Sequence, residues 1–220
     1  PKTTLFGATK FRHCVIRTND KGPNLFGSLY PNTTVGNAIS DLPALANGEK
    51  NEKVGYRHSP PNNYQSEIRA GNLMVKNHSC KNLGELMMAR VKAVPKHPGA
   101  GWLDLPELLK PKNLVKHGDN RYPNRFGRLW WDGIFNTIVS EANPYWGRVI
   151  HPEQERVISV REAARAQSLP DSMEFSGSLA AQYKQIGNAV PPILAKAIGV
   201  EIIRAMGINV DLPEKDNGKA

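Results

Sequence analysis

The tetrapeptide Gln185-Ile186-Gly187-Asn188 places a carboxamide shortly before two consecutive prolines, Pro191 and Pro192. An asparagine side chain carries two N–H donors and a carbonyl acceptor, a set suited to holding a polar small molecule. The same residues also permit a plain structural interpretation, a turn whose asparagine caps the following helix. The surroundings of Asn188 decide between these two interpretations.

Cations cluster in the middle of the 220-residue chain, whose net charge is +9 and whose pI is near 9.6. Residues 110 to 128 contain six cations and one acid, Asp119, so the net charge of these nineteen residues is +5. The cations are Lys110, Lys112, Lys116, Arg121, Arg125 and Arg128. This excess favours a polyanionic partner, although a basic loop can also serve solubility alone. Arg128 has the alternative of pairing with Asp132 or Glu141.

The two cysteines, Cys14 and Cys80, lie in no CxxC pattern and beside no paired histidines. A disulfide framework and a structural metal site are therefore not expected, and each thiol is interpreted as a small buried hydrophobe. No apolar run approaches the roughly 18 residues of a membrane span, and the first residues lack a signal-peptide core. A reducing compartment, cytoplasmic or nuclear, and no membrane partner are expected.

Several helices can be predicted from caps and apolar periodicity. Thr33 or Thr34 can cap a helix that Pro43 ends, a second helix falls within residues 82–94, and Ser159 with Glu162 has the spacing of a capping box. In the second helix Leu83, Leu86, Met87 and Val91 are expected on one face. The prolines at 191 and 192 suit a first helical turn, and Gly207 suits the end of that helix. Its broad apolar face is expected to dock on a core.

The strand signals are weaker. The aromatic and β-branched segment 129–139 resembles a strand with a turn at Asp132-Gly133, and Trp130 and Trp131 are expected in the core. Residues 147–160 resemble two strand runs around a turn at His151-Pro152. Segments rich in Pro, Gly and Asn indicate that loops dominate from about 45 to 128, which is uncommon unless they bind something.

The two motifs "RVISVREAARAQSLPD" and "QIGNAVPPILAKAIGVEI" together resemble the last two motifs of DNA (cytosine-5) methyltransferases, in the right order and about fifteen residues apart. Upstream segments such as "FGRLWWDGIFNTIV" are similar to the eukaryotic maintenance-type branch, which methylates CpG. Two departures stand out: Ser168-Leu169 replaces the usual Gly-Phe, and Ala163 replaces a common Cys.

The resemblance implies an α/β fold: the C-terminal portion of a Rossmann-like methyltransferase that uses S-adenosylmethionine, with a largely irregular, small α+β target-recognition domain. Residues 1–44 would end the catalytic domain, residues 45–155 would form the target-recognition domain, and residues 156–220 would return to the catalytic domain.

The resemblance also implies site residues. Asn188, Ala189 and Val190 would line the cofactor pocket, and Arg161, Glu162 and Arg165 would fix the recognition region, unless they form a solvated helix face. Duplex DNA would be contacted by Lys116, Asn120, Arg121, Tyr122, Arg125, Arg128, Trp146 and Arg148, with Tyr145 as a further candidate. The target cytosine would be flipped out of the duplex.

The family's nucleophile, a cysteine in a Pro-Cys dipeptide, is not in this sequence, and neither are its Glu-Asn-Val segment, its Gln-x-Arg-x-Arg segment or a Gly-rich cofactor loop. The chain alone is therefore expected to be inactive, and it would need the missing N-terminal catalytic half, in one longer chain or as a separate subunit. The alternatives are a catalytically inactive DNA-binding or regulatory module and an RNA-directed remnant. A nuclear location is expected, as is poor solubility without the partner half.

Overall fold

A computed structural model of the chain describes residues 33–116 and 122–207. In chain order the elements are α1 (Val35–Ile39), β1 (Lys50–Gly55), α2 (Asn63–Arg69), β2 (Met74–Ser79), α3 (Glu85–Ala93), the 3-10 turns η1 (Trp102–Asp104) and η2 (Glu107–Leu109), α4 (Lys112–Val115), β3 (Gly127–Arg128), η3 (Pro144–Trp146), β4 (Arg148–Ile150), α5 (Val160–Ala166), α6 (Leu179–Gly187) and α7 (Pro192–Ala205).

The strands of the described residues form two small sheets. β1 and β2 pair antiparallel, from Lys50 opposite Ser79 to Gly55 opposite Met74. β3 and β4 pair parallel with an irregular register, and Ile150 also bridges Val157. The doubly wound sheet of a Rossmann-like domain is not among the described residues, so that part of the predicted fold stays a prediction, as do the three domain boundaries.

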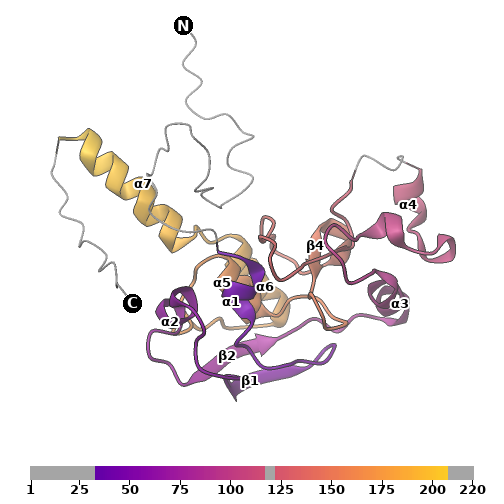
Figure 1. Cartoon of the computed structure of the whole chain (residues 1–220), viewed down its shortest axis with the longest axis horizontal. Coiled ribbons are helices and arrows are strands. Elements are labelled where there is room, and N and C mark those ends of the chain that lie inside the picture. The colour runs from indigo at the N-terminus through magenta and orange to yellow at the C-terminus, as the bar shows by residue number, and fades with distance from the viewer. Residues whose placement is uncertain (1–32, 117–121, 208–220) are drawn as a thin grey trace, which may run out of the picture.

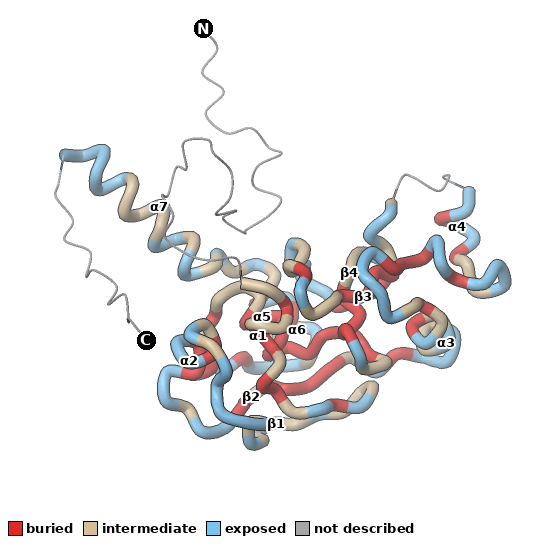
Figure 2. Tube along the Cα trace, viewed as in Figure 1, coloured by how far each residue is buried: buried red, intermediate tan, exposed pale blue. Residues whose placement is uncertain are grey.

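Helices α1, α5 and α6 gather over one face of the β1–β2 pair, where α5 packs against β2, α1 and α6 (Figure 1). Buried residues form one core cluster, and Figure 2 shows them running through this layer and on toward α3. Val35, Val75, Val91, Ile150 and Val160 are each fully buried in it. The core therefore joins segments from the start, middle and end of the described chain.

Three predicted helices are confirmed with their caps. Thr34 and Asn37 form a capping box on α1, and Ser159 and Glu162 form one on α5. α7 begins at Pro192, and Gly207 follows its end with a φ of 75°, a conformation that glycine adopts without strain. The helix within 82–94 is also present as α3, but Leu86 is 56% exposed and does not share the buried face of Val91.

The predicted strand over residues 129–139 is wrong, although the turn at its centre is present. The backbone N–H groups of Val35 and Gly36 donate to the carbonyls of Gly133 and Trp131 at 2.7 and 2.8 Å. These carbonyls satisfy the free donors at the start of α1, so this segment does not form a strand ladder. The strand runs around His151-Pro152 are confirmed as β4 and the bridge at Val157.

The segment from 45 to 128, where loops were expected to dominate, also contains β1, α2 and β2. Residues 185–187 of the expected turn are the end of α6. α7 differs from its predicted packing, because none of its residues is buried. It projects from the body, and its tube is exposed or intermediate throughout (Figure 2). The prediction that α7 docks on a core is therefore wrong for the contacts within the described chain.

The segment Leu179–Ala205, which spans α6 and α7, is long and apolar enough to cross a membrane by length and composition. The expectation that no run reaches that length is thus wrong. A single such segment is weak evidence, and here two helices meet within it at residues 188–191. The absence of a membrane partner stays a prediction.

Candidate functional site

The junction between α6 and α7 carries the three residues predicted to line a cofactor pocket. Asn188 ends α6 through its backbone N–H, which donates to the carbonyls of Lys184 and Ile186. Its exposed side chain makes no hydrogen bond to the described residues. Val190 is 65% exposed, whereas Ala189 packs against the core. The Asn188 amide is therefore not an inward helix cap, and the junction presents a polar and an apolar group to the outside.

Two contacts with the segment after α5 hold this junction. The side-chain amide of Gln167 donates to the carbonyl of Ile186 at 3.2 Å, and the Ser168 hydroxyl accepts from the N–H of Ile193 at 3.3 Å. Ser168 has a φ of 54°, in the left-handed region that favours glycine. A serine occupies this conformation here, and its hydroxyl caps the start of α7.

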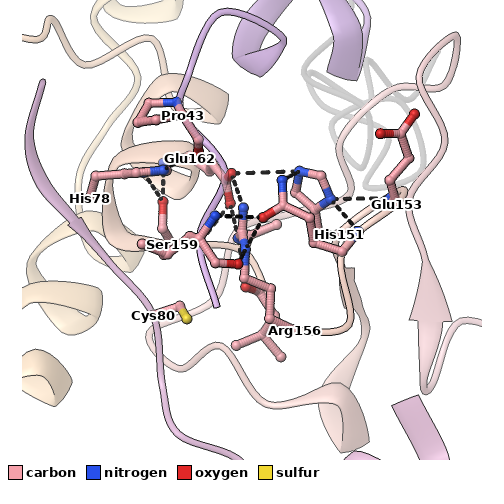
Figure 3. Close-up of polar contacts among 12 residues, drawn as sticks. Pro43, His78, Cys80, His151, Glu153, Arg156, Ser159 and Glu162 are labelled. Atoms are coloured by element: carbon pink, nitrogen blue, oxygen red, sulfur yellow. Dashed lines mark hydrogen bonds and ion pairs between the residues drawn. The ribbon is translucent and has the colours of Figure 1, made fainter. Parts of the chain in front are cut away.

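Glu162 is buried within α5, and its carboxylate is fully used (Figure 3). Arg156 donates from both terminal nitrogens to the two Glu162 oxygens at 2.7 Å each, and the Ser159 N–H donates to one of them at 2.7 Å. Burial alone would raise the pKa of Glu162, but the adjacent Arg156 guanidinium lowers it well below its usual range.

Arg165 and Arg161 tie α5 to its neighbours. Arg165 pairs with Asp41, which follows α1, at 2.5 Å and with Asp171 at 2.6 Å. Arg161 donates to the carbonyl of Lys76 in β2 at 2.8 Å and to the carbonyl of Met173 at 2.7 Å. All three predicted positioning residues are buried, so the alternative of a solvated helix face is wrong. They link α5 to α1 and β2.

Two histidines extend this buried polar network (Figure 3). The His78 ring contacts the Ser159 hydroxyl and the Pro43 carbonyl at 2.9 Å each. Nδ1 of His151 accepts from the backbone N–H groups of Glu153 and Gln154 at 3.1 and 3.0 Å. Burial lowers the pKa of both histidines, that of His151 to about 3. Both rings are therefore neutral at pH 7.

Cys80 lies beside this network, and its thiol is buried and donates to the Ala46 carbonyl at 3.2 Å. Burial raises the pKa of the thiol, which disfavours the nucleophilic thiolate. The predicted buried role of Cys80 is confirmed, whereas Cys14 lies outside the described residues. Among the described residues no cluster of His, Cys, Asp and Glu could hold a metal ion.

Arg128 was predicted to contact DNA, and the structure contradicts this. The residue is 1% exposed, and its guanidinium donates to the carbonyls of Val91 and His151 at 2.8 and 2.9 Å. It also pairs with Glu155 at 2.9 Å, in place of the predicted alternatives Asp132 and Glu141. Because the Arg128 guanidinium is buried and bound by these carbonyls and by Glu155, Arg128 is a structural residue.

The other predicted DNA contacts lie at or near the surface. Lys116 is exposed at the end of α4, and Asn120 and Arg121 lie outside the described residues. The Arg125 guanidinium lies 4.0 Å from the ring centroid of Tyr122. Arg148 lies 4.6 Å from that of Trp130 and donates to the Asn124 side chain at 3.2 Å.

Neither Arg125 nor Arg148 pairs with a carboxylate of the described residues. These two cations therefore keep their charge available for an anion. Trp130 and Trp131, which were expected in the core, are only partly buried, and Trp131 donates from its indole N–H to Glu153 at 2.8 Å.

Sequence comparison identifies the family of the chain. The family model of the C-5 cytosine-specific DNA methylases matches residues 33–204. The chain belongs to this family. DNA (cytosine-5)-methyltransferase 2 of Arabidopsis thaliana is 40% identical over 202 residues, which are 85% of this chain and 13% of that protein. DNA (cytosine-5)-methyltransferase 1 of Mus musculus is 34% identical over 226 residues, which cover 77% of this chain and 14% of that protein.

This chain thus spans only 13–14% of the length of these relatives. A solved structure of a prophage-encoded protein from E. coli, assigned as a DNA modification methyltransferase, matches with a TM-score of 0.57 and 18% identity over 86% of this chain and 51% of that one. This match concerns the fold alone. The mixture of helices and strands described above is consistent with an α/β methyltransferase fold.

Proposed function

We propose that this chain is the C-terminal part of the methyltransferase domain of a maintenance-type DNA (cytosine-5) methyltransferase. In this proposal it recognises duplex DNA at CpG sites and completes the S-adenosylmethionine pocket for methyl transfer to C5 of a flipped-out cytosine. Its work would take place in the nucleus.

The observation that carries the proposal is the exposed Asn188 side chain at the junction of α6 and α7, which makes no hydrogen bond to the described residues. The free Asn188 amide can hydrogen bond a polar part of the cofactor, and the exposed Val190 side chain can contact an apolar part. These residues fit one wall of a cofactor pocket, and the other walls would come from the catalytic half. S-adenosylmethionine, when bound, supplies an electrophilic methyl group. The role of this chain is to bind and orient it.

The DNA-binding part of the proposal rests on cations whose charge is not neutralised by a carboxylate of the described residues. Lys116 is exposed, and Arg125 and Arg148 form no salt bridge with the described residues. Such cations can neutralise phosphates, so the affinity for duplex DNA should fall steeply as salt rises.

Inactivity of the chain alone follows from the chemistry of the family and the sequence. The sequence contains no Pro-Cys dipeptide, and the Cys80 thiol is buried with a raised pKa. A cysteine must be accessible as a thiolate to add to the pyrimidine ring. The nucleophile would therefore come from the missing catalytic half.

Reconstitution tests the proposal. The chain is mixed with the Pro-Cys half of the catalytic domain of the Arabidopsis thaliana relative, and methyl incorporation from labelled S-adenosylmethionine into a CpG duplex is measured. We expect incorporation with the mixture and none with either part alone. Asn188→Ala should raise the KM for S-adenosylmethionine roughly tenfold, the value of about one lost hydrogen bond to a charged or polar partner, without changing the melting temperature.

Asn113→Ala is the matched control, because Asn113 is an exposed asparagine in α4, at the end of the structure away from α7 (Figure 1). It should leave the KM unchanged. Duplex binding without methyl incorporation in any combination would contradict the proposal and favour the inactive regulatory module.

A further inference from the structure

Three aromatic rings surround the Arg125 guanidinium. Its central carbon lies 4.0 Å from the ring centroid of Tyr122, 4.4 Å from that of Tyr145 and 5.3 Å from that of Trp146. Guanidinium groups attract ring faces at such distances. Together these four residues are called the aromatic platform.

The core holds the aromatic platform in place. The buried Phe126 meets Tyr145 edge to face at 6.2 Å, and Tyr145 meets Trp146 in the same way at 5.1 Å. Phe126 has a φ of 52°, and its N–H donates to the Pro144 carbonyl at 2.6 Å. A bulky residue in the left-handed region is strained, and such strain persists only where the surrounding structure fixes it.

The outer member of the platform is open. Trp146 is 56% exposed, although a tryptophan side chain normally buries most of its large apolar surface. Arg125 forms no salt bridge with a carboxylate of the described residues, whereas the buried Arg128 and Arg156 each have one. The platform thus combines an exposed ring with a cation whose charge is not neutralised there.

We propose that the aromatic platform binds one unpaired nucleobase, which stacks on the Trp146 ring while Arg125 attracts the adjoining phosphate. An exposed aromatic ring beside a cation suits a single-stranded nucleotide, because every base has a face that can stack. In a fully paired duplex both faces of each internal base are already stacked, so the platform discriminates against it. This inference rests on the proposed DNA-binding function and adds a ligand, an unpaired nucleotide, to it.

Binding of the full chain to three labelled probes tests the inference: a short single strand, a fully paired duplex, and the same duplex with one extra unpaired nucleotide. We expect the bulged duplex to bind roughly tenfold more tightly than the paired one, which is within the range of one stacked base. Trp146→Leu should weaken binding of the bulged duplex more than binding of the paired one and so remove this preference, whereas Trp146→Phe should keep part of the preference.

Lys112→Ala is the control, because Lys112 is an exposed cation of α4 outside the aromatic platform; it should leave the preference unchanged. Melting curves check that each variant folds.

The inference is overturned if Trp146→Leu still prefers the bulged duplex, or if the unaltered chain shows no such preference. In both cases binding of the paired duplex would still support the proposed function. Binding of the bulged probe alone, dependent on Trp146, would support the inference and count against duplex recognition. Binding to none of the probes would overturn both.

Discussion

His151 lies buried between the Arg156–Glu162 pair and the backbone of residues 153–154, and its ring is neutral in the folded chain. Its pKa is lowered to about 3 by burial, against about 6.5 in an unfolded chain. The unfolded state therefore binds more protons between these values, and stability is lost as pH falls through 6.5. We expect the free energy of unfolding to fall by about 2 kcal/mol between pH 7 and pH 5 from this group.

Chemical denaturation of the chain and of His151→Asn at both pH values measures this contribution. An asparagine oxygen can accept from the same two backbone N–H groups but cannot ionise in this range. Part of the pH dependence of the free energy of unfolding should remain in the variant, because burial also lowers the pKa of His78. His97→Asn, at an exposed position, should keep the full slope. Equal slopes in the chain and in His151→Asn would contradict the prediction.

At the residue scale the sequence predicts which groups carry charge but not where they lie. The capping role of Glu162 is visible in its spacing from Ser159, but its partner Arg156 and the acids Asp41 and Asp171 were not identified. Arg128 and Arg125 stand three positions apart, yet one is buried with Glu155 and the other stacks on rings. Only tertiary packing separates such cations, and no local pattern reports it.

At the element scale Gly187 decides how closely α6 approaches the segment before β4. Its φ is not in the positive region, so an alanine would suit the helix and would favour it by about 0.5–1 kcal/mol. A β-carbon there would lie 2.5 Å from the backbone nitrogen of Ser140 and 2.7 Å from the carbonyl carbon of Val139. Backbone atoms cannot move as a flexible side chain can, so Gly187→Ala should destabilise the chain by about 1–3 kcal/mol.

Gly199→Ala is the matched control in α7, because a β-carbon at Gly199 would meet no described atom within 4 Å. It should stabilise the chain slightly or leave its stability unchanged. Thermal unfolding of both variants compares the two positions. A Gly187→Ala variant as stable as Gly199→Ala would show that the close approach is not a constraint.

Elements with local signals could be predicted, and elements made by distant partners could not. Capping boxes and prolines locate α1, α5 and α7 because these signals lie within a few residues. β1, with the sequence KNEKVG, lacks apolar alternation and exists through its pairing with β2. Of the cofactor site, the motif identifies Asn188 to Val190, but its placement at a helix junction beside Ser168 needed the structure.

At the scale of the whole molecule the uncovered α7 determines how the chain behaves in solution. Ile198, Ile202 and Met206 follow one stripe of this helix and are 38%, 55% and 68% exposed. An exposed apolar stripe of this kind favours contact with another surface. We therefore expect the isolated chain to associate, and the double variant Ile198→Glu/Ile202→Glu to be monomeric in sedimentation velocity over a range of concentrations.

Charge alone could also disperse the chain, and Lys196→Glu separates the two causes. It changes the net charge by the same two units as the double variant, but it lies at an exposed position away from the apolar stripe. If the stripe drives association, Lys196→Glu should associate like the unaltered chain, and the double variant should also lose methyl incorporation when mixed with the Pro-Cys half. A monodisperse monomer for the unaltered chain would contradict the prediction, because the exposed stripe would then not drive association.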